Sequence, residues 1–285
     1  MQIDQRCLKC ISDQGKRIGD ILHLDDSEKR ALEALTTQHI ASFDLHSTPP
    51  HNAAPLYEAI AKHLHVYDLY ETFKKNSSKR AQEFIPLCQS HLQNSAHPLL
   101  TATKTAVAGN VIDLAAVMLY DLEEELEKVY QTPFAIDDFT ALETKLSQTK
   151  TLVYLADNAG EEIFDKLYIQ TIRSLFPTMN VYYFVRGRPI INDLTYQEAQ
   201  SSKMNDVATI IDSGVPTPGL ALELMHPHAK VLLEQAECVI SKGMGNFECL
   251  SEVKKYPIFF LFKVKCHVVA EAVGARLGDI VCKQA

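Results

Sequence analysis

The second half of the sequence contains five short runs of β-branched, aliphatic and aromatic residues. Each run is followed by turn or charged residues and then by an amphipathic segment. Runs of this length that alternate with helical patterns are typical of parallel strands joined by right-handed crossover helices. We therefore predict an α/β fold with an open, mainly parallel sheet between two layers of helices, an α/β/α sandwich. The expected strands are Thr151–Ala156, Val181–Val185, Val207–Asp212, Cys238–Ser241 and Ile258–Val264.

Residues 1–147 have a different pattern, because their apolar residues recur at helical spacing. One such helix face is formed by Leu56, Ile60 and Leu64. Pro55 is expected to interrupt the chain before this helix. The sequence thus predicts an N-terminal all-helical domain over residues 1–147 and an α/β domain over residues 148–285.

The composition limits the class of partner. The 285 residues carry 28 Lys and Arg against 36 Asp and Glu, a net charge of −8, whereas general nucleic-acid binders usually have a basic face. No run approaches the roughly 18 apolar residues of a membrane span, and residues 1–16 lack the apolar core of a signal peptide. Seven scattered cysteines are expected to be reduced thiols in this context. We therefore expect a cytoplasmic protein that binds neither nucleic acid nor a membrane.

Polar residues follow the expected strands at the place where open α/β sheets bind ligands, beyond the carboxyl ends of the strands. Carboxylates and carboxamides follow the first two strands, and lysines and glycines follow the later ones. Hard divalent cations prefer carboxylate and carboxamide oxygens, while lysines and a glycine-rich backbone neutralise phosphate. The pattern therefore indicates a divalent metal ion together with a phosphate. The residues concerned are Asp157, Asn158, Asn192, Asp193, Lys242, Gly243, Gly245 and Lys265.

Helix capping is a simpler interpretation of two of these turns. Capping-box spacing occurs in Asn158 with Glu161 and in Thr195 with Glu198. Capping does not account for Asp157, which stands directly before the first box. It also leaves Lys242 and Lys265, at neighbouring strand ends, unexplained.

Asn110 is a further candidate, because it follows Gly109 inside a helical pattern. Glycine costs a helix about 1 kcal/mol relative to alanine, so its presence usually has a packing or functional reason. Close packing against the α/β half is one reason. The other is that Asn110 reaches over the strand ends and closes the site.

Other motifs leave two alternatives open. The segment Lys242–Glu248 contains Gly-x-Gly after a strand, but Glu248 stands where a dinucleotide fingerprint has its third glycine. A nucleotide- or methyl-donor-binding enzyme that uses this loop is the first alternative. Cys7 and Cys10 have the Cys-x-x-Cys spacing that suits zinc, an iron–sulfur cluster or thiol exchange. A non-catalytic metal or thiol module is the second.

Taken together, these motifs resemble the metal-dependent damage-control phosphatases, a family long described as a domain of unknown function. The cysteine motifs and the segment around Asn110 are similar to its archaeal and bacterial subfamily in particular. The resemblance spans residues 7–266, nearly the whole chain. The segments that carry it are Cys7–Cys10, Ala108–Asp113, Asp157–Glu162, Asn192–Asp193, Ser241–Glu248 and Lys265–Cys266.

The resemblance implies a helical domain packed on an α/β/α domain, and a divalent ion, Mn, Ni, Co or Mg. In the family this ion is held by residues that match Asp157, Asn158 and Asp193. Family members hydrolyse small phosphorylated metabolites such as sugar phosphates. The substrate contacts that the resemblance implies fall at Glu162, in the loop with Gly243, Gly245 and Asn246, and at Lys265.

We therefore predict a metal-dependent phosphatase with a damage-control role. Asp157 and Asp193 are the expected catalytic residues, since both hold the metal and Asp193 also orients or deprotonates the attacking water. An aspartyl nucleophile is the alternative. Lys242 and Lys265 are expected to neutralise the phosphate from two sides. The substrate, the ion, the oligomeric state and the role of the thiols do not follow from the sequence.

Overall fold

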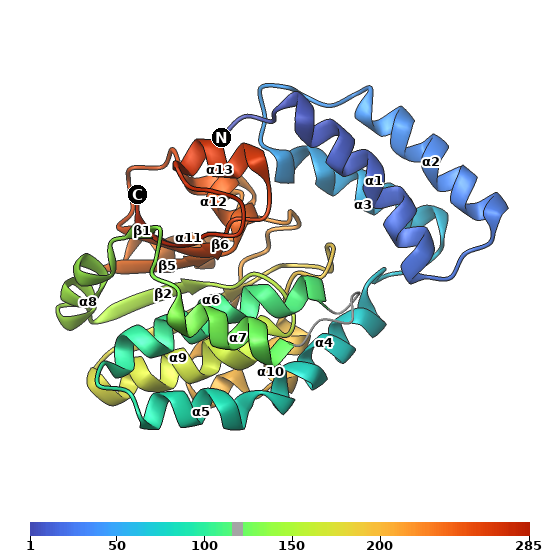
Figure 1. Cartoon of the computed structure of the whole chain (residues 1–285). Helices are drawn as coiled ribbons and strands as arrows, with labels where there is room; N and C mark the ends of the chain where they lie inside the picture. Colours follow the sequence, from blue (N-terminus) through green and yellow to red (C-terminus); the bar gives the residue numbers. More distant parts are fainter. Residues whose placement is uncertain (116–121) are drawn as a thin grey trace.

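The structure contains the sheet that the sequence predicts. It is a computed structural model, and it describes residues 1–115 and 122–285. Within these ranges seven strands form one sheet in the order β1-β7-β6-β5-β2-β3-β4 (Figure 1). The strands are β1 (Ile136–Asp137), β2 (Thr151–Leu155), β3 (Asn180–Val185), β4 (Thr209–Asp212), β5 (Cys238–Lys242), β6 (Ile258–Lys263) and β7 (Ile280–Gln284).

The five predicted runs correspond to β2 through β6, and neighbouring strands among them pair in parallel. The prediction of an open, mainly parallel sheet is therefore confirmed. β1 and β7 were not predicted. β7 pairs antiparallel with β6 and parallel with β1. Residues 1–147 are thus not wholly helical, because β1 comes from this part, and a strand of two residues is too short to have a recognisable pattern.

Helices cover both faces of the sheet (Figure 1). Alternate residues of β2 point to opposite faces, so Leu152 and Tyr154 join one buried cluster and Val153 and Leu155 join the other. The first cluster includes residues of α4 to α10, and the second includes residues of α11 to α13. These helices are α4 (Glu71–Glu83), α5 (Ile85–Gln93), α6 (Pro98–Ala115), α7 (Leu122–Gln131), α8 (Phe139–Ser147), α9 (Glu161–Leu175), α10 (Tyr196–Ser201), α11 (Pro227–Glu234), α12 (Met244–Leu250) and α13 (His267–Val273), with short 3₁₀ turns η1 (Met204–Asp206) and η2 (Leu222–Leu224).

The first three helices form a separate unit, drawn in blue in Figure 1. They are α1 (Gln5–Ile21), α2 (Asp26–Ile40) and α3 (Pro49–His63). Their buried cluster also contains Ile190 from the loop after β3. The ion pair of Arg6 Nη1 with Glu271 Oε1 on α13, at 2.7 Å, ties this unit to the α/β part.

α3 begins earlier than the sequence pattern indicates. Thr48 caps it by accepting a hydrogen bond from the backbone N–H of His51, and Pro49 and Pro50 occupy its first turn. Proline is tolerated there because the first N–H groups of a helix have no intrahelical partner. Pro55 therefore lies inside the helix and not before it.

The helices of residues 1–147 are divided between two packing environments. The buried residues of α1 to α3 form their own cluster, whereas Val107 of α6 and Phe139 of α8 share a cluster with the sheet residue Leu152. The predicted boundary at residue 147 stays a prediction. In the described ranges, no helix combines the length and the apolar character needed to cross a membrane.

Candidate active site

The loops after β2 and β3 are joined by backbone hydrogen bonds, which brings three predicted metal ligands together. The backbone N–H of Leu194 donates to the carbonyl of Asp157 at 2.8 Å, and Asn158 and Asp193 form an antiparallel bridge. Asp157, Asn158 and Asp193 are all buried. The fold thus places two carboxylates and one carboxamide at the carboxyl ends of adjacent strands.

Glu161 lies at the centre of the hydrogen bonds around these residues. Its Oε1 accepts from Asn158 Nδ2 at 2.9 Å and from Asn110 Nδ2 at 2.6 Å. Its Oε2 lies 3.0 Å from Lys242 Nζ. The predicted capping box of Asn158 with Glu161 is wrong, because α9 is preceded by Gly160 with a φ of 98° and has no side-chain cap. Glu161 binds site residues and caps nothing.

Asn110 reaches the strand ends from α6, and Gly109 lets it do so. Asn110 Nδ2 also lies 3.2 Å from Asp157 Oδ2. A Cβ atom at Gly109 would meet Phe164 Cδ2 at 3.1 Å and Glu161 Cα at 3.4 Å, so α6 packs closely on α9. The close packing at Gly109 is therefore observed and Asn110 reaches the strand ends, whereas closure of the site by Asn110 stays a prediction. The side chain of Asp113, in the same motif, lies outside the described residues.

Lys242 is turned into the protein. Its ammonium is fully buried between Glu161 and Asp165, with Asp165 Oδ1 at 2.8 Å. Burial lowers the pKa of Lys242, but the carboxylates of Asp165 and Glu161 outweigh this effect and the net shift is upward. Lys242 is therefore a cation that the fold uses to hold two carboxylates.

Arg186 and Asn246 support the other side of the site. Arg186 Nε donates to Asp193 Oδ2 at 2.7 Å, and Arg186 Nη2 donates to Asn246 Oδ1 at 3.0 Å. Asn246 Oδ1 also accepts from the N–H of Leu220, and Asn246 Nδ2 donates to the carbonyls of Ala156 and Lys242. These contacts use the full hydrogen-bonding capacity of this carboxamide along its lone-pair and N–H directions. The sequence predicts a substrate contact for Asn246, and in the structure it positions Arg186.

Gly243 and Gly245 allow close approach of the chain at the site. Gly243 precedes α12 with a φ of 79°, and a Cβ atom there would lie 1.9 Å from Asp157 Oδ2. A Cβ atom at Gly245 would lie 2.0 Å from the carbonyl oxygen of Pro218. Only glycine fits at either position, and at Gly243 the neighbour is a predicted metal ligand.

Buried carboxylates outnumber buried cations here. Burial, together with Glu161 and Asp193, raises the pKa of Asp157 well above its usual range. Burial raises the pKa of Asp193 to about 6, and Arg186 opposes this shift. A third buried cation, Lys74, acts on Asp193 but is paired with Asp68 and Glu198. The hydrogen-bonded network of the site itself has four buried carboxyl groups and two buried cations. The carboxylates belong to Asp157, Glu161, Asp165 and Asp193, and the cations to Lys242 and Arg186.

This excess of negative charge, with oxygen donors of the hard type, fits a divalent cation. Within the described ranges, no three His, Cys, Asp or Glu side chains are grouped to hold a metal ion. The predicted set has two carboxylates and the Asn158 carboxamide, which would leave the other ligand positions to water and phosphate oxygens. Such open coordination is usual for ions that act on phosphates.

Glu162 faces a different space. It accepts hydrogen bonds from Ser78 Oγ at 2.7 Å and from the backbone N–H of Gly160, and burial raises its pKa to about 7. Glu162 and Arg186 line a cavity of about 630 Å³ between α4, α10 and the loop after β3. Glu162, a predicted substrate contact, therefore lies in the wall of this cavity.

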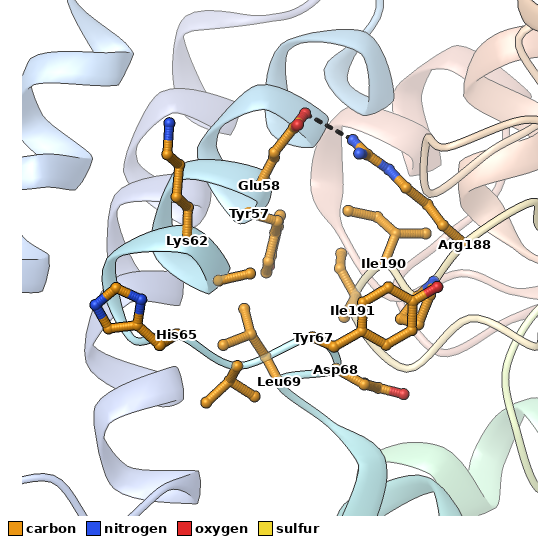
Figure 2. Close-up of a pocket in the computed structure, with 13 residues that line it drawn as sticks. Tyr57, Glu58, Lys62, His65, Tyr67, Asp68, Leu69, Arg188, Ile190 and Ile191 are labelled. Atoms are coloured by element: carbon orange, nitrogen blue, oxygen red, sulfur yellow. Dashed lines mark hydrogen bonds and ion pairs between the residues drawn. The ribbon is translucent and has the colours of Figure 1, made fainter.

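A second cavity, of about 460 Å³, lies between α3 and the same loop, and it shares Tyr67, Asp68 and Arg188 with the first (Figure 2). Glu58 on α3 pairs with Arg188 across its rim at 2.7 Å. Ile191, which lines it, has a φ of 45°, a rare conformation for a β-branched residue. Ile191 also packs against the buried cluster of α1 to α3, so the loop is held against this unit just before Asp193.

Lys265 lies near the site and is followed by Cys266, whereas the other two thiols of the resemblance, Cys7 and Cys10, come from α1. Half-buried Lys265 lowers the pKa of Asp157 by its charge, against the larger effect of burial. Cys10 is exposed on α1, and burial raises the pKa of the Cys7 and Cys266 thiols. All seven cysteines are free.

Sequence reasoning missed Glu161 and Asp165 as site residues. They are four apart, hence on one face of α9, and this spacing was a usable signal. Each was assigned a local role or none, because the partners come from distant strands.

Comparison with known proteins agrees with this arrangement. The family model described as the damage-control phosphatase ARMT1-like domain matches residues 3–281. The damage-control phosphatase PH1575 of Pyrococcus horikoshii is 30% identical over 99% of this chain and 98% of its own length. A damage-control phosphatase of Archaeoglobus fulgidus is 32% identical over 82% of this chain and 81% of its own.

A solved structure extends the match to the fold. The crystal structure of the DUF89 family protein of Pyrococcus horikoshii superposes with a TM-score of 0.91 at 28% identity, and covers 100% of this chain and 99% of that one. The sequence and fold matches thus both run over essentially the whole chain. The chain belongs to the damage-control phosphatase ARMT1-like domain family.

Proposed function

We propose that the chain is a divalent-metal-dependent phosphatase that hydrolyses small phosphorylated metabolites in a damage-control role. The relatives named damage-control phosphatase match it over most of their length. The observation that carries the metal dependence is the excess of buried carboxylates over buried cations at the carboxyl ends of β2, β3 and β5.

The proposed metal ligands are Asp157, Asn158 and Asp193, and Mn, Ni, Co and Mg all accept such donors. A bound divalent ion supplies Lewis-acid stabilisation of phosphate oxygens. Arg186 fixes the Asp193 carboxylate through Oδ2, so that its other oxygen orients or deprotonates a water. Because Gly243 has no Cβ atom, the Asp157 carboxylate can lie directly against the backbone there.

One role differs from the role that the sequence indicates. We assign to Lys242, whose ammonium is enclosed, the holding of Glu161, and the phosphate contact stays with Lys265, whose charge acts on Asp157. Glu162 then belongs to the cavity of about 630 Å³ that receives the rest of the substrate. Asn110 closes the site from α6.

Metal analysis of the purified protein together with a phosphatase assay tests the proposal. Oxygen-bound divalent metal and phosphate release from an aryl phosphate are expected. A retained dinucleotide or methyl donor would favour the loop Lys242–Glu248 as a cofactor site. Thiolate-bound zinc or iron without turnover would favour a module centred on Cys7 and Cys10.

Replacing Lys265 with methionine is expected to raise the KM for an aryl phosphate about tenfold, because a charge-assisted contact to the phosphate is lost. Steady-state kinetics at saturating metal measure this effect. The matched control is Lys263→Met, since Lys263 is two residues away and pairs with Glu125 at 3.4 Å. Equal KM values in the two variants would exclude a phosphate contact for Lys265.

Metal is expected to raise the Tm by about 5 °C more near pH 8 than near pH 5.5. In the folded chain the pKa of Asp193 is raised to about 6, whereas the unfolded chain releases this proton near its usual pKa. The metal-free fold therefore loses stability as the pH rises through this interval, and a cation that binds the deprotonated carboxylate restores it. Thermal unfolding with and without Mn²⁺ measures the shift. A shift that is equal at both pH values contradicts the ligand assignment.

A further inference from the structure

A line of buried polar groups runs beneath the proposed metal ligands. It starts at Asp165 on α9, whose side chain is fully buried. Asp165 Oδ1 accepts from Tyr154 OH at 2.6 Å, and Oδ2 accepts from Tyr183 OH at 2.8 Å. Lys242 Nζ lies 2.8 Å from the same Oδ1. Two hydroxyls and one ammonium thus fix Asp165 from neighbouring strands.

The line continues from Lys242 to Glu161 and ends at Asn158. Lys242 Nζ donates to Glu161 Oε2 at 3.0 Å, and Asn158 Nδ2 donates to Glu161 Oε1 at 2.9 Å. Every donor in this line faces a carboxylate, which only accepts. Asn158 Nδ2 also donates to Asp157 Oδ2 at 2.9 Å. Glu161, together with Asp157, therefore fixes which end of the Asn158 carboxamide faces them, namely the NH₂ group.

The orientation of Asn158 matters because its two ends are chemically different. A cation binds the carbonyl oxygen of a carboxamide, and the NH₂ group repels it. While Glu161 holds the NH₂ group, the carbonyl oxygen of Asn158 is kept for the proposed metal ion. Groups behind the ligands that fix their orientation typically change metal affinity or activity 10- to 100-fold when removed.

We propose that Asp165 is a positioning residue for the metal site. Through Lys242 and Glu161 it fixes the direction in which Asn158 presents its carbonyl oxygen. The Lys242 ammonium is enclosed between the carboxylates of Glu161 and Asp165. Loss of the Asp165 charge leaves Glu161 as its charged partner, so the ammonium moves toward Glu161. This inference rests on the proposed function, since the affected property is metal binding.

The test uses Asp165→Asn in the full chain, with Mn²⁺ as the probe. Asparagine keeps the size and an acceptor oxygen but removes the charge. Its Mn²⁺ affinity, measured by electron paramagnetic resonance of free Mn²⁺, is expected to fall about tenfold. At saturating Mn²⁺ the KM for an aryl phosphate is expected to stay within about twofold of the parent value, because Asp165 has no contact with the substrate-facing groups.

Two controls separate positioning from stability. Leu146→Ala truncates a buried residue of α8 outside the line, so it lowers the Tm and is expected to leave Mn²⁺ affinity unchanged. Tyr154→Phe keeps the Asp165 charge but removes the hydrogen bond that Tyr154 OH donates to Asp165 Oδ1, the oxygen that faces Lys242. A loss of Mn²⁺ affinity of about threefold, between the other two, is expected. If Asp165→Asn does not fold, the Mn²⁺ affinities of Tyr154→Phe and Leu146→Ala are compared in its place to test the positioning role.

The outcomes distinguish failure of the positioning role of Asp165 from failure of the proposed function. If the parent protein binds Mn²⁺ and Asp165→Asn, or Tyr154→Phe in its place, binds it equally well, the positioning role is overturned and the proposed function stands. If Leu146→Ala loses Mn²⁺ affinity to the same degree, the effect is one of stability and the positioning role is again overturned. If the parent protein binds no divalent ion, both proposals fail.

Discussion

Replacing Asp193 with asparagine is expected to reduce divalent-dependent hydrolysis of an aryl phosphate by more than about 100-fold while the protein stays folded. The variant loses one of two charged metal ligands and the oxygen that we assign to the attacking water. The fold should survive, because the asparagine oxygen can still accept the hydrogen bond that Arg186 Nε gives to Asp193 Oδ2. Turnover at several Mn²⁺ concentrations, with circular dichroism as the check on folding, measures the effect.

Asp137 provides the matched control for this substitution. It also ends a strand of the sheet, but it is exposed, and its Oδ1 accepts from the N–H of Phe139 at 3.1 Å. Asp137→Asn is therefore expected to leave turnover within about twofold of the parent value. A folded Asp193→Asn variant with the turnover of Asp137→Asn would sink the assignment of Asp193.

Replacing Gly243 with alanine is expected to abolish turnover to a similar degree. The added Cβ atom would stand 1.9 Å from Asp157 Oδ2, so the carboxylate must leave its place. The backbone at φ 79° and ψ 165° lies in a region that essentially only glycine adopts, which adds about 1–3 kcal/mol of strain for another residue. Loss of Mn²⁺ binding in parallel with turnover, in a protein that remains folded, is the expected signature.

Gly274 separates the two parts of this effect. It follows α13 with a φ of 80° and a ψ of 35°, so it shares the positive φ of Gly243 but not its ψ of 165°, and a Cβ atom there would have nothing within 4 Å. Gly274→Ala should therefore show the strain, as a lower Tm, without the loss of turnover. If Gly274→Ala lost activity as Gly243→Ala does, displacement of Asp157 would no longer explain the result.

The parts of the site that could be predicted are those whose chemistry is local. Asp157 and Asn158 stand directly beyond the first predicted strand, and Asp193 lies in the loop after the second. The rule that ligands bind at strand ends pointed to all three, and the family resemblance implied them as a ligand set. The five central strands were equally predictable, because each has a run of apolar residues bounded by turn residues.

The rest depended on partners far along the chain. Lys242 follows a strand and reads as a phosphate ligand, but its ammonium meets Glu161 and Asp165, 81 and 77 residues away in sequence. Asn246 reads as a loop contact, yet Arg186 and the carbonyl of Ala156 occupy its amide. Which of several polar residues faces the ligand and which faces another side chain is set by tertiary packing, which spacing along the sequence does not contain.

The position of β7 has a consequence for synthesis on the ribosome. β7 lies between β6 and β1, and β1 pairs with β7. β1 leaves the ribosome roughly 150 residues before β7, which at about 5–20 residues per second is a delay of about 7–30 s. Until β7 pairs, β6 (Ile258–Lys263) keeps one unpaired edge. The order of the strands therefore makes the insertion of β7 between β6 and β1 a late event of folding. Until then, the unpaired edge of β6 can form hydrogen bonds with strands of other chains.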